Sequence, residues 1–200
     1  MTSSLVGSEM CIRDRKKDLA KAGNEKRFAK DKKFWDDQLD ALGEPLYSDI
    51  QGPSVLEEAR KRHGNPKLRS SDIEMKELFV AVKDYYLEPG PTKNLIDFCM
   101  NHQLSMTNLL LLGIRTYLSK VNNGQEDITI QNFISRRSTH DEWTSGGSRT
   151  IMFPCRTVIA PETDFLSAAY EIQNMQNRIY MHSNYDPAFI MDEMRKRYNT

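Results

Sequence analysis

The chain has 200 residues, of which 38% are hydrophobic and 28% are charged, values typical of soluble globular domains. Its 28 basic and 28 acidic side chains cancel, which excludes a global electrostatic field that would attract nucleic acid or an anionic membrane. The longest apolar stretch is far too short to span a bilayer, so we expect no membrane segment.

The first residues, MTSSLVGSEMCIRDR, show neither helical nor strand periodicity. The run SLVGSEMCIRDR resembles translated sequencing-adapter sequence found at the ends of metagenomic gene fragments. We therefore interpret residues 1–15 as a non-native leader and expect that the reading frame was truncated upstream of it.

Residues 16–51 form the next predicted segment, a charged lead-in followed by a helix. Residues 16–33 are dense in charge and should be solvated. Phe34, Trp35 and Leu39 then recur at helical spacing, and Gly43 is placed to end this helix.

Residues 52–76 contain prolines, glycines and a run of basic side chains, and we interpret them as a mobile basic loop. The basic residues are Arg60, Lys61, Arg62, His63, Lys67 and Arg69. Either they are simply solvated, or they contact an acidic partner such as a carrier protein.

Two helices are predicted after a first strand. The strand is expected over residues 77–83, where apolar positions alternate. Thr92 is a candidate N-cap for the following helix, and Ser105 or Thr107 for the next. The apolar positions of residues 106–121 are wider than one helix face, so that helix should be packed on several sides.

The rest of the chain predicts two strands and a long helix. Residues 127–134 and 149–159 have strand patterns on either side of a polar loop. Thr163 or Asp164 should cap a helix that continues to about Ile179. Strands interleaved with helices in this order predict an α/β fold, a two-layer sandwich with helices packed on one face of the sheet.

Three motifs in order carry a resemblance to a known family. They are TNLLLLGIRTYLSKVNNGQEDITIQNFISRR from Thr107 to Arg137, GSRTIMFPCR from Gly147 to Arg156, and HSNYDP from His182 to Pro187. Their order and spacing resemble the C-terminal half of the condensation domain of nonribosomal peptide synthetases. In the second motif only the two ends match, because Ile151 and Met152 stand where the family has Asn and Thr.

The resemblance implies a fold similar to chloramphenicol acetyltransferase, with a mixed sheet, in an incomplete form. Residues 16–51 would include an inter-lobe helix, and residues 77–200 would be the C-terminal lobe, truncated at its end. Two lobes meet at a tunnel in this family, and an H-H-x-x-x-D-G motif in the first lobe supplies the catalytic histidine. That motif is absent from this sequence.

The implied function is that of a fragment of a domain that joins carrier-bound acyl or peptidyl and aminoacyl thioesters by amide-bond formation. This piece would supply the tunnel wall opposite the catalytic histidine and would be inactive alone. Its partners would be the missing N-terminal lobe and the carrier domains, whose phosphopantetheine arms hold the substrates. No directly bound cofactor, metal or nucleic acid is expected.

The candidate tunnel or carrier-arm residues are Arg136, Arg137, Gly147 and Arg156. Guanidinium groups suit contacts with a phosphate or with a carboxylate of the partner lobe. A plain ion pair is the alternative for the arginines. By strand alternation, Arg156 would be either buried with a carboxylate or exposed at the tunnel.

Two other functions remain open. His182 and Asp186 have the H-x-x-x-D spacing of acyltransferases and could serve a stand-alone enzyme that uses coenzyme A, although a helix before them and Pro187 after them favour a simple turn. The chain could also be a non-catalytic docking module of a degenerate synthetase. A missing lobe would leave apolar surface exposed, so we expect poor solubility.

The three cysteines are Cys11, Cys99 and Cys155, and no two of them form a C-x-x-C pair. This usage fits a reducing compartment better than a disulfide framework or a zinc site. We therefore expect a cytoplasmic protein without a structural metal.

Overall fold

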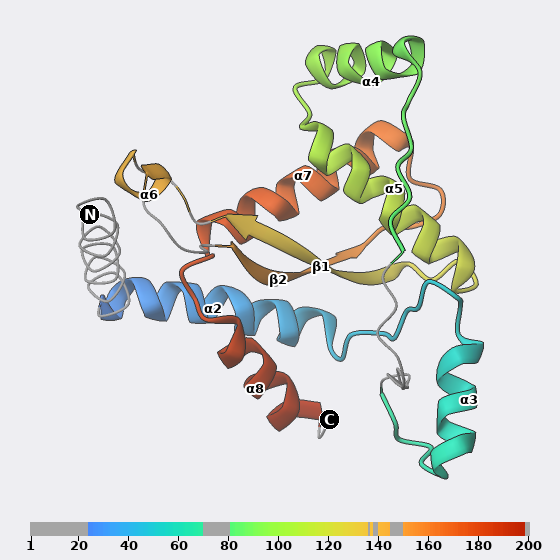
Figure 1. Cartoon of the computed structure of the whole chain (residues 1–200). Coiled ribbons are helices and arrows are strands. Elements are labelled where there is room, and N and C mark those ends of the chain that lie inside the picture. The colour runs from blue at the N-terminus through green and yellow to red at the C-terminus, as the bar shows by residue number, and fades with distance from the viewer. Residues whose placement is uncertain (1–23, 70–80, 136, 138–139, 145–149, 199–200) are drawn as a thin grey trace, which may run out of the picture. The chain divides into compact units, whose positions relative to one another are not determined.

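A computed structural model describes residues 24–69, 81–135, 137, 140–144 and 150–198 (Figure 1). The predicted leader, residues 1–15, lies outside these ranges. The described elements, in chain order, are α2 (Glu25–Leu42), α3 (Ser54–His63), α4 (Pro89–Asn101), α5 (Met106–Val121), β1 (Asp127–Ser135), α6 (His140–Thr144), β2 (Thr150–Val158), α7 (Phe165–Met181) and α8 (Pro187–Tyr198).

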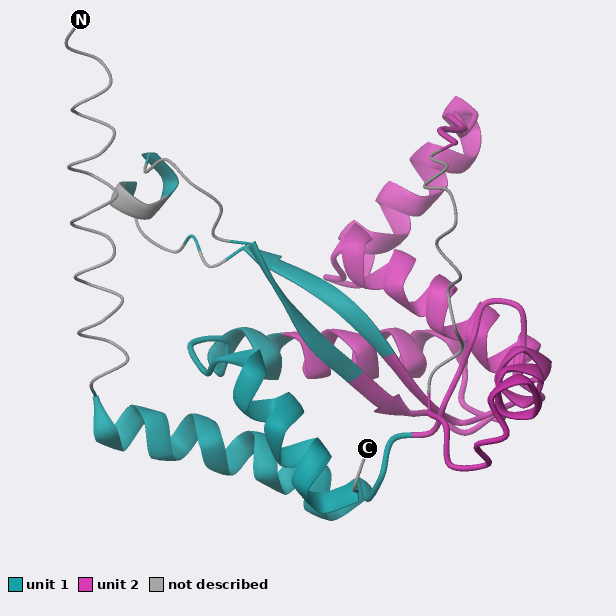
Figure 2. Cartoon of the chain, turned by 60° about the horizontal axis from the view of Figure 1, so that its bottom comes forward, with its two compact units in different colours: residues 1–45, 130–155, 177–200 teal, residues 46–129, 156–176 magenta. Residues whose placement is uncertain are grey.

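The chain divides into two compact units (Figure 2). Unit 1 comprises residues 1–45, 130–155 and 177–200, and unit 2 comprises residues 46–129 and 156–176. The strands β1 and β2 and the helix α7 each contribute residues to both units.

Helix α2 belongs to unit 1 and begins and ends where its sequence indicates. The side chain of Asn24 accepts a hydrogen bond from the Arg27 backbone N–H, which satisfies one of the unpaired donors of the first turn. At the other end, Gly43 has φ +65° and donates its N–H to the Leu39 carbonyl. The predicted helix is confirmed, and it begins nine residues before Phe34.

The core of unit 1 forms around the apolar face of α2. The Trp35 ring stacks on Phe153 of β2, with ring centroids 5.5 Å apart. The large side chains that are buried in this unit are Phe34, Trp35, Leu39, Ile130, Ile134, Phe153, Ile179, Tyr185 and Ile190. Burial of each such side chain contributes about 1.5–3 kcal/mol, so this cluster holds α2, α8 and the unit 1 parts of α7 and the strands together.

Unit 2 contains α3, α4 and α5, together with the start of β1, the end of β2 and most of α7. Ser105 is the N-cap of α5, and its hydroxyl accepts a hydrogen bond from the Asn108 N–H at 3.2 Å. The predicted bounds of this helix are confirmed. The predicted cap of α4 is wrong, because α4 begins at Pro89 and the Thr92 hydroxyl lies inside it, donating to the Glu88 carbonyl.

Two predictions for residues 52–83 need correction. Residues 54–63, predicted as part of a mobile loop, form the helix α3, whose Leu56 and Ala59 are buried. Pro53 precedes this helix and Gly64 ends it, so the two residues interpreted as loop formers are helix boundaries. Residues 81–83 of the predicted strand have no regular structure and are exposed, and residues 77–80 lie outside the described ranges.

The described sheet consists of β1 and β2, and both strands were predicted. The Ile159 N–H donates to the Glu126 carbonyl, so the start of β1 lies beside the end of β2 and the two strands are antiparallel. Ile128, Ile130 and Ile134 are buried on one face of β1, as their alternation predicts. The α/β fold class is therefore confirmed, although the described part of the sheet is antiparallel and not mixed.

The outer face of α5 is not packed as predicted. Leu109, Leu112 and Leu118 are buried, but Leu110 is 57% exposed, and Ile114 and Tyr117 are each 53% exposed. These three positions follow one another at helical spacing and form a continuous apolar stripe. We refer to Leu110, Ile114 and Tyr117 as the α5 stripe.

Two further findings bear on the composition-based expectations. Cys99 and Cys155 are buried thiols that form no disulfide with each other. Among the helices of the described ranges, none has the length and apolar character that a membrane span requires.

Candidate functional site

The imidazole of His182 lies in the core of unit 1, directly after α7. Its Nδ1 is 2.8 Å from Oδ1 of Asp31 on α2, and because a carboxylate can only accept, Nδ1 carries the hydrogen. The ring stacks on Phe34, with centroids 4.2 Å apart and planes within 11°. Its backbone carbonyl accepts from the Trp35 indole N–H at 3.4 Å. Side-chain and backbone contacts together fix the position and orientation of this imidazole.

Asp186 has a different task from the one that its spacing suggests. Its carboxylate accepts a hydrogen bond from the Ala188 N–H at 2.9 Å, at the beginning of α8. This is an N-capping contact next to Pro187, the first residue of that helix. The carboxylate that contacts His182 comes from Asp31, so the local arrangement agrees with the turn interpretation of the H-x-x-x-D spacing and not with a His182–Asp186 pair.

Arg156 lies in unit 2 and forms an ion pair with Asp127. Its Nε is 2.8 Å from Oδ1 of Asp127, and its Nη2 contacts Oδ2, so the guanidinium is held by two parallel hydrogen bonds. The two side chains are 9% and 14% exposed. The strand pattern left Arg156 either buried with a carboxylate or exposed at the tunnel. The structure shows the first of these, burial with the Asp127 carboxylate.

A second guanidinium, that of Arg115 on α5, lies beside this pair. It donates to the Thr157 hydroxyl, to the Ile159 carbonyl at 3.1 Å and to the Glu126 carbonyl. Burial lowers the pKa of Arg115, while the nearby carboxylates of Asp127 and Glu126 act in the opposite direction. Arg115 therefore ties α5 to both strands at one end of the hairpin.

Of the remaining predicted site residues, only Arg137 is described. Its Nη1 donates to the Trp143 carbonyl, and the Trp143 indole N–H donates to the Arg137 carbonyl at 2.8 Å. These contacts join the end of β1 to α6. Arg136 and Gly147 lie outside the described residues. Arg137, His182 and Asp186 belong to unit 1, and Arg156 belongs to unit 2.

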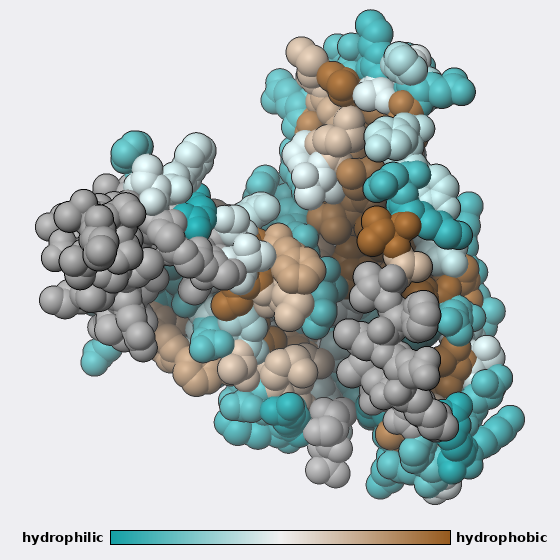
Figure 3. All heavy atoms as spheres, viewed as in Figure 1, coloured by the Kyte–Doolittle hydropathy of each residue, from teal (hydrophilic) through white to brown (hydrophobic). Residues whose placement is uncertain are grey.

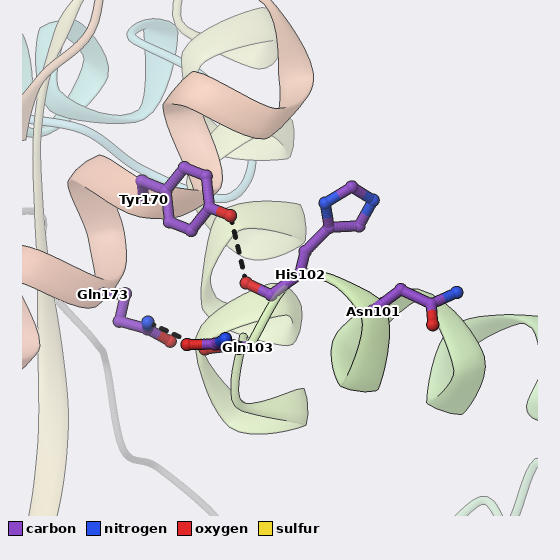
Figure 4. Close-up of a pocket in the computed structure, with 5 residues that line it drawn as sticks. All are labelled: Asn101, His102, Gln103, Tyr170 and Gln173. Atoms are coloured by element: carbon purple, nitrogen blue, oxygen red, sulfur yellow. Dashed lines mark hydrogen bonds between the residues drawn. The ribbon is translucent and has the colours of Figure 1, made fainter.

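A polar pocket of about 260 Å³ lies in unit 2 and is lined by Asn101, His102, Gln103, Tyr170 and Gln173 (Figure 4). The Tyr170 hydroxyl donates to the His102 carbonyl at 3.0 Å, and the Gln173 amide donates to the Gln103 carbonyl at 3.0 Å. The Asn101 and His102 side chains point away from Tyr170 and Gln173. These hydrogen bonds attach the turn between α4 and α5 to α7. Because the His102 ring points away from the Tyr170 hydroxyl, the pocket does not bring a general base against a nucleophile.

The sequence interpretation missed Asp31, Arg115 and Asp127, which are the partners that define these contacts. Asp31 and Arg115 are ionisable residues at helical spacing from buried apolar positions, and both are at most 5% exposed. A charge on an apolar face was the available signal that each has a buried partner. The identity of those partners depends on tertiary contacts, which no local pattern specifies. Within the described residues, no cluster of three or more potential metal ligands occurs.

Comparisons with known proteins agree on one family. A family model described as "Condensation domain" matches residues 14–199. One of the plipastatin synthase proteins of Bacillus subtilis (strain 168) is 22% identical over 170 residues, which are 84% of this chain and 6% of that protein.

Solved structures show the same fold. The first condensation domain of the calcium-dependent antibiotic synthetase, in complex with substrate analogue 2a, matches with a TM-score of 0.66 and 15% identity, over 88% of this chain and 36% of that chain. A crystal structure of the first condensation domain of the CDA synthetase matches with the same score and 14% identity, over 88% of this chain and 34% of that chain.

This chain thus spans about a third of the solved chains that it matches, and these matches support the predicted chloramphenicol acetyltransferase-like fold class. The family model covers far more than half of the chain. The chain belongs to the condensation-domain family, which confirms the resemblance to nonribosomal peptide synthetase condensation domains found in its sequence.

Proposed function

We propose that this chain is part of a domain that joins two carrier-bound thioesters by forming an amide bond, and that it supplies the tunnel wall opposite the catalytic histidine. The observation that carries the proposal is the condensation-domain match over residues 14–199. The sequence lacks the H-H-x-x-x-D-G motif, so in this proposal the histidine comes from a segment that this chain does not contain.

The reaction itself sets what each part must do. The amine of one substrate attacks the thioester carbonyl carbon of the other, a C–N bond forms, the C–S bond breaks, and the carrier thiol leaves as the amine gives up a proton. A histidine is suited to accept that proton near neutral pH. The opposite wall must position the two arms and exclude water, which would otherwise hydrolyse the thioester.

The contacts around His182 support a structural role for this imidazole. Its Nδ1 is used by Asp31 and its ring is stacked on Phe34, while Asp186 caps a helix. We therefore assign no step of amide formation to His182. Arg156 is paired with Asp127, and the Arg137 guanidinium donates to the Trp143 carbonyl, so contact of either arginine with a phosphopantetheine arm stays a prediction. Arg136 and Gly147 remain predictions.

The proposal is tested by the genomic sequence upstream of Lys16 and by the activity of the protein that it encodes. An H-H-x-x-x-D-G motif in frame, about one lobe upstream, supports the proposal. The extended protein should then form amide bonds between aminoacyl thioesters on phosphopantetheinylated carrier domains. A stop codon upstream with a genuine start at Met1 would overturn it.

Two variants of the extended protein separate the proposal from its rivals. Alanine at the second histidine of the upstream motif should abolish amide formation, whereas His182→Ala should retain it as long as the protein stays folded. Thioester turnover by the present chain alone that is lost in His182→Ala would favour the stand-alone acyltransferase. Carrier binding without turnover by the extended protein would favour the docking module.

A further inference from the structure

The C-terminal end of α3 and the loop after it form a basic surface on unit 2. The exposed basic residues are Lys61, Arg62, His63, Lys67 and Arg69, and we call them the α3 basic cap. The opposite side of the helix is buried through Leu56 and Ala59. The helix is therefore fixed in place by its apolar side and presents its charges outward (Figure 3, hydrophilic colouring over α3 as labelled in Figure 1).

The loop after α3 is folded back onto the helix. The Arg60 guanidinium donates from Nε to the Leu68 carbonyl at 3.0 Å. The Asn65 side chain accepts from the Lys67 N–H at 3.0 Å, and the Leu68 N–H donates to the Asn65 carbonyl. These bonds hold Lys67 beside the last turn of the helix, so cations from two segments share one ordered surface.

Some exposed lysines on other helices form i,i+4 ion pairs. Lys33 pairs with Asp37 and Lys93 pairs with Asp97, at 2.7 and 2.5 Å. Glu57 and Glu58 stand four residues before Lys61 and Arg62, the spacing that favours such pairs. Within the described residues, however, no ion pair of Lys61, Arg62 or Lys67 is formed, which leaves their charges available to a partner.

Helix geometry alone accounts for only part of this cluster. Basic residues are favoured in the last turn of a helix because they face its unpaired carbonyl groups, and that effect is confined to the last turn. Lys67 and Arg69 lie beyond the end of α3 at His63, where the effect no longer applies. The fold-back of the loop adds cations that helix stability does not require.

We propose that the α3 basic cap binds an acidic surface of another protein or domain. The cap is small and has acidic neighbours at Glu57 and Glu58, and residues 54–69 contain no Phe, Tyr or Trp. Tight binding of nucleic acid needs many phosphate contacts, and single strands also need aromatic platforms. A compact group of cations with carboxylates beside it fits instead a protein surface of complementary charge. This inference does not depend on the proposed amide-forming function.

The test measures binding of the intact chain to a synthetic helical peptide that carries glutamate at every exposed position. The variant Lys61→Gln/Arg62→Gln/Lys67→Gln removes three charges from the cap. The control Lys26→Gln/Lys30→Gln/Lys83→Gln removes three exposed charges elsewhere and gives the same net charge. Fluorescence anisotropy at about 50 mM and about 300 mM salt reports affinity and its electrostatic part.

Loss of about tenfold in affinity in the cap variant, little change in the control, and weakening at the higher salt would support the proposal. Equal losses in the two variants would overturn it, because binding would then follow net charge. Absence of measurable binding at the lower salt would also overturn it. A single-stranded oligonucleotide that binds more tightly than the peptide, and loses affinity in the cap variant, would assign the surface to nucleic acid instead.

Discussion

Nδ1 of His182 and Oδ1 of Asp31 lie 2.8 Å apart although the two residues are separated by 151 positions in the chain. Asp31 is 4% exposed, so its carboxylate is removed from water and depends on this contact. Nε of Arg27, one turn earlier on α2, lies 4.0 Å from the other carboxylate oxygen of Asp31. The His182–Asp31 contact thus joins α2 to the turn between α7 and α8 within unit 1.

Breaking this contact should destabilise the protein. We expect His182→Ala to lower the free energy of unfolding by about 1–3 kcal/mol, because it leaves the Asp31 carboxylate without its buried partner. Urea unfolding measures this loss. A double-mutant cycle with Asp31→Ala should show that the two losses are not additive.

Asp37→Asn is the matched control for the His182–Asp31 cycle, since Asp37 lies on the same helix and its pair with Lys33 is exposed. It should change the free energy of unfolding by less than about 1 kcal/mol. Additive effects of the two core substitutions would show that the imidazole and the carboxylate act independently.

The Arg156–Asp127 pair should be more sensitive to loss of one partner than to loss of both. Arg156→Met removes the bidentate partner of a nearly buried carboxylate, and we expect a loss of about 3 kcal/mol in the free energy of unfolding. The double variant Arg156→Met/Asp127→Leu should recover a large part of that loss, because it removes both charges of the pair and so their cost of desolvation.

Chemical denaturation of the wild type and the two Arg156 variants decides this point. Lys93→Met, which breaks an exposed pair with Asp97, is the control and should cost little. A double variant that is as unstable as the single variant would mean that Arg156 is needed for more than balancing the charge of Asp127.

The α5 stripe should make the isolated chain bind hydrophobic dyes and associate. Leu110→Gln/Ile114→Gln should lower dye fluorescence and the associated fraction in light scattering, since both side chains are more than half exposed. The unfolding free energy should change by less than about 0.5 kcal/mol. Leu112→Ala, on the buried face of the same helix, should instead cost about 2–5 kcal/mol. Unchanged dye binding in the double variant would remove the stripe as the source of association.

The sequence predicted the elements well wherever local signals agreed with tertiary burial. The bounds of α5 and both strands follow from alternation and from the cap at Ser105. Residues 54–63 were misinterpreted because Pro53 and Gly64 resemble loop formers, whereas proline is also favoured at the beginning of a helix and glycine just after its end.

The functional contacts were less predictable than the elements. His182 was singled out by its spacing to Asp186, but its partner is Asp31, and spacing along the chain carries no information on such a distant contact. The exposed stripe on α5 was likewise hidden, since apolar residues all round a helix predict burial on all sides. Family motifs identified the fold because they record tertiary constraints that one local pattern does not contain.

The stability contributed by the α7 cap should fall in acid. The Asp164 carboxylate accepts from the Ser167 N–H at 3.0 Å, and hydrogen bonds from Ser167 lower the pKa of Asp164 below its ordinary value of 3.8. The folded state therefore binds the proton less readily than the unfolded state. The contribution is present above pH 3.8 and is lost as the pH falls through the lower folded-state pKa.

Asp164→Asn isolates this contribution, because asparagine caps a helix without titrating. Urea midpoints measured between about pH 5 and pH 2.5 should fall less steeply in the variant than in the wild type. Parallel pH profiles for the two proteins would show that the cap of α7 does not contribute to acid sensitivity.

Gly52 should resist substitution for two reasons that act together. Its φ is +91°, a conformation that residues with a Cβ rarely adopt, and an added Cβ would lie 3.0 Å from the Val121 carbonyl oxygen. That oxygen belongs to the backbone at the end of α5 and cannot move without disturbing the helix. The Gly52 N–H also donates to the Asp49 carbonyl, which is itself held by the Asn122 amide.

We expect Gly52→Ala to lower the free energy of unfolding by more than about 1 kcal/mol, measured by urea denaturation. Gly113→Ala is the matched control, since Gly113 lies in α5, is exposed and has no atom within 4 Å of an added Cβ. In a helix interior this change should stabilise by about 0.5–1 kcal/mol. Opposite signs for the two identical substitutions would locate the strain at the contact between residue 52 and the end of α5, whereas a neutral Gly52→Ala would show that this turn relaxes freely.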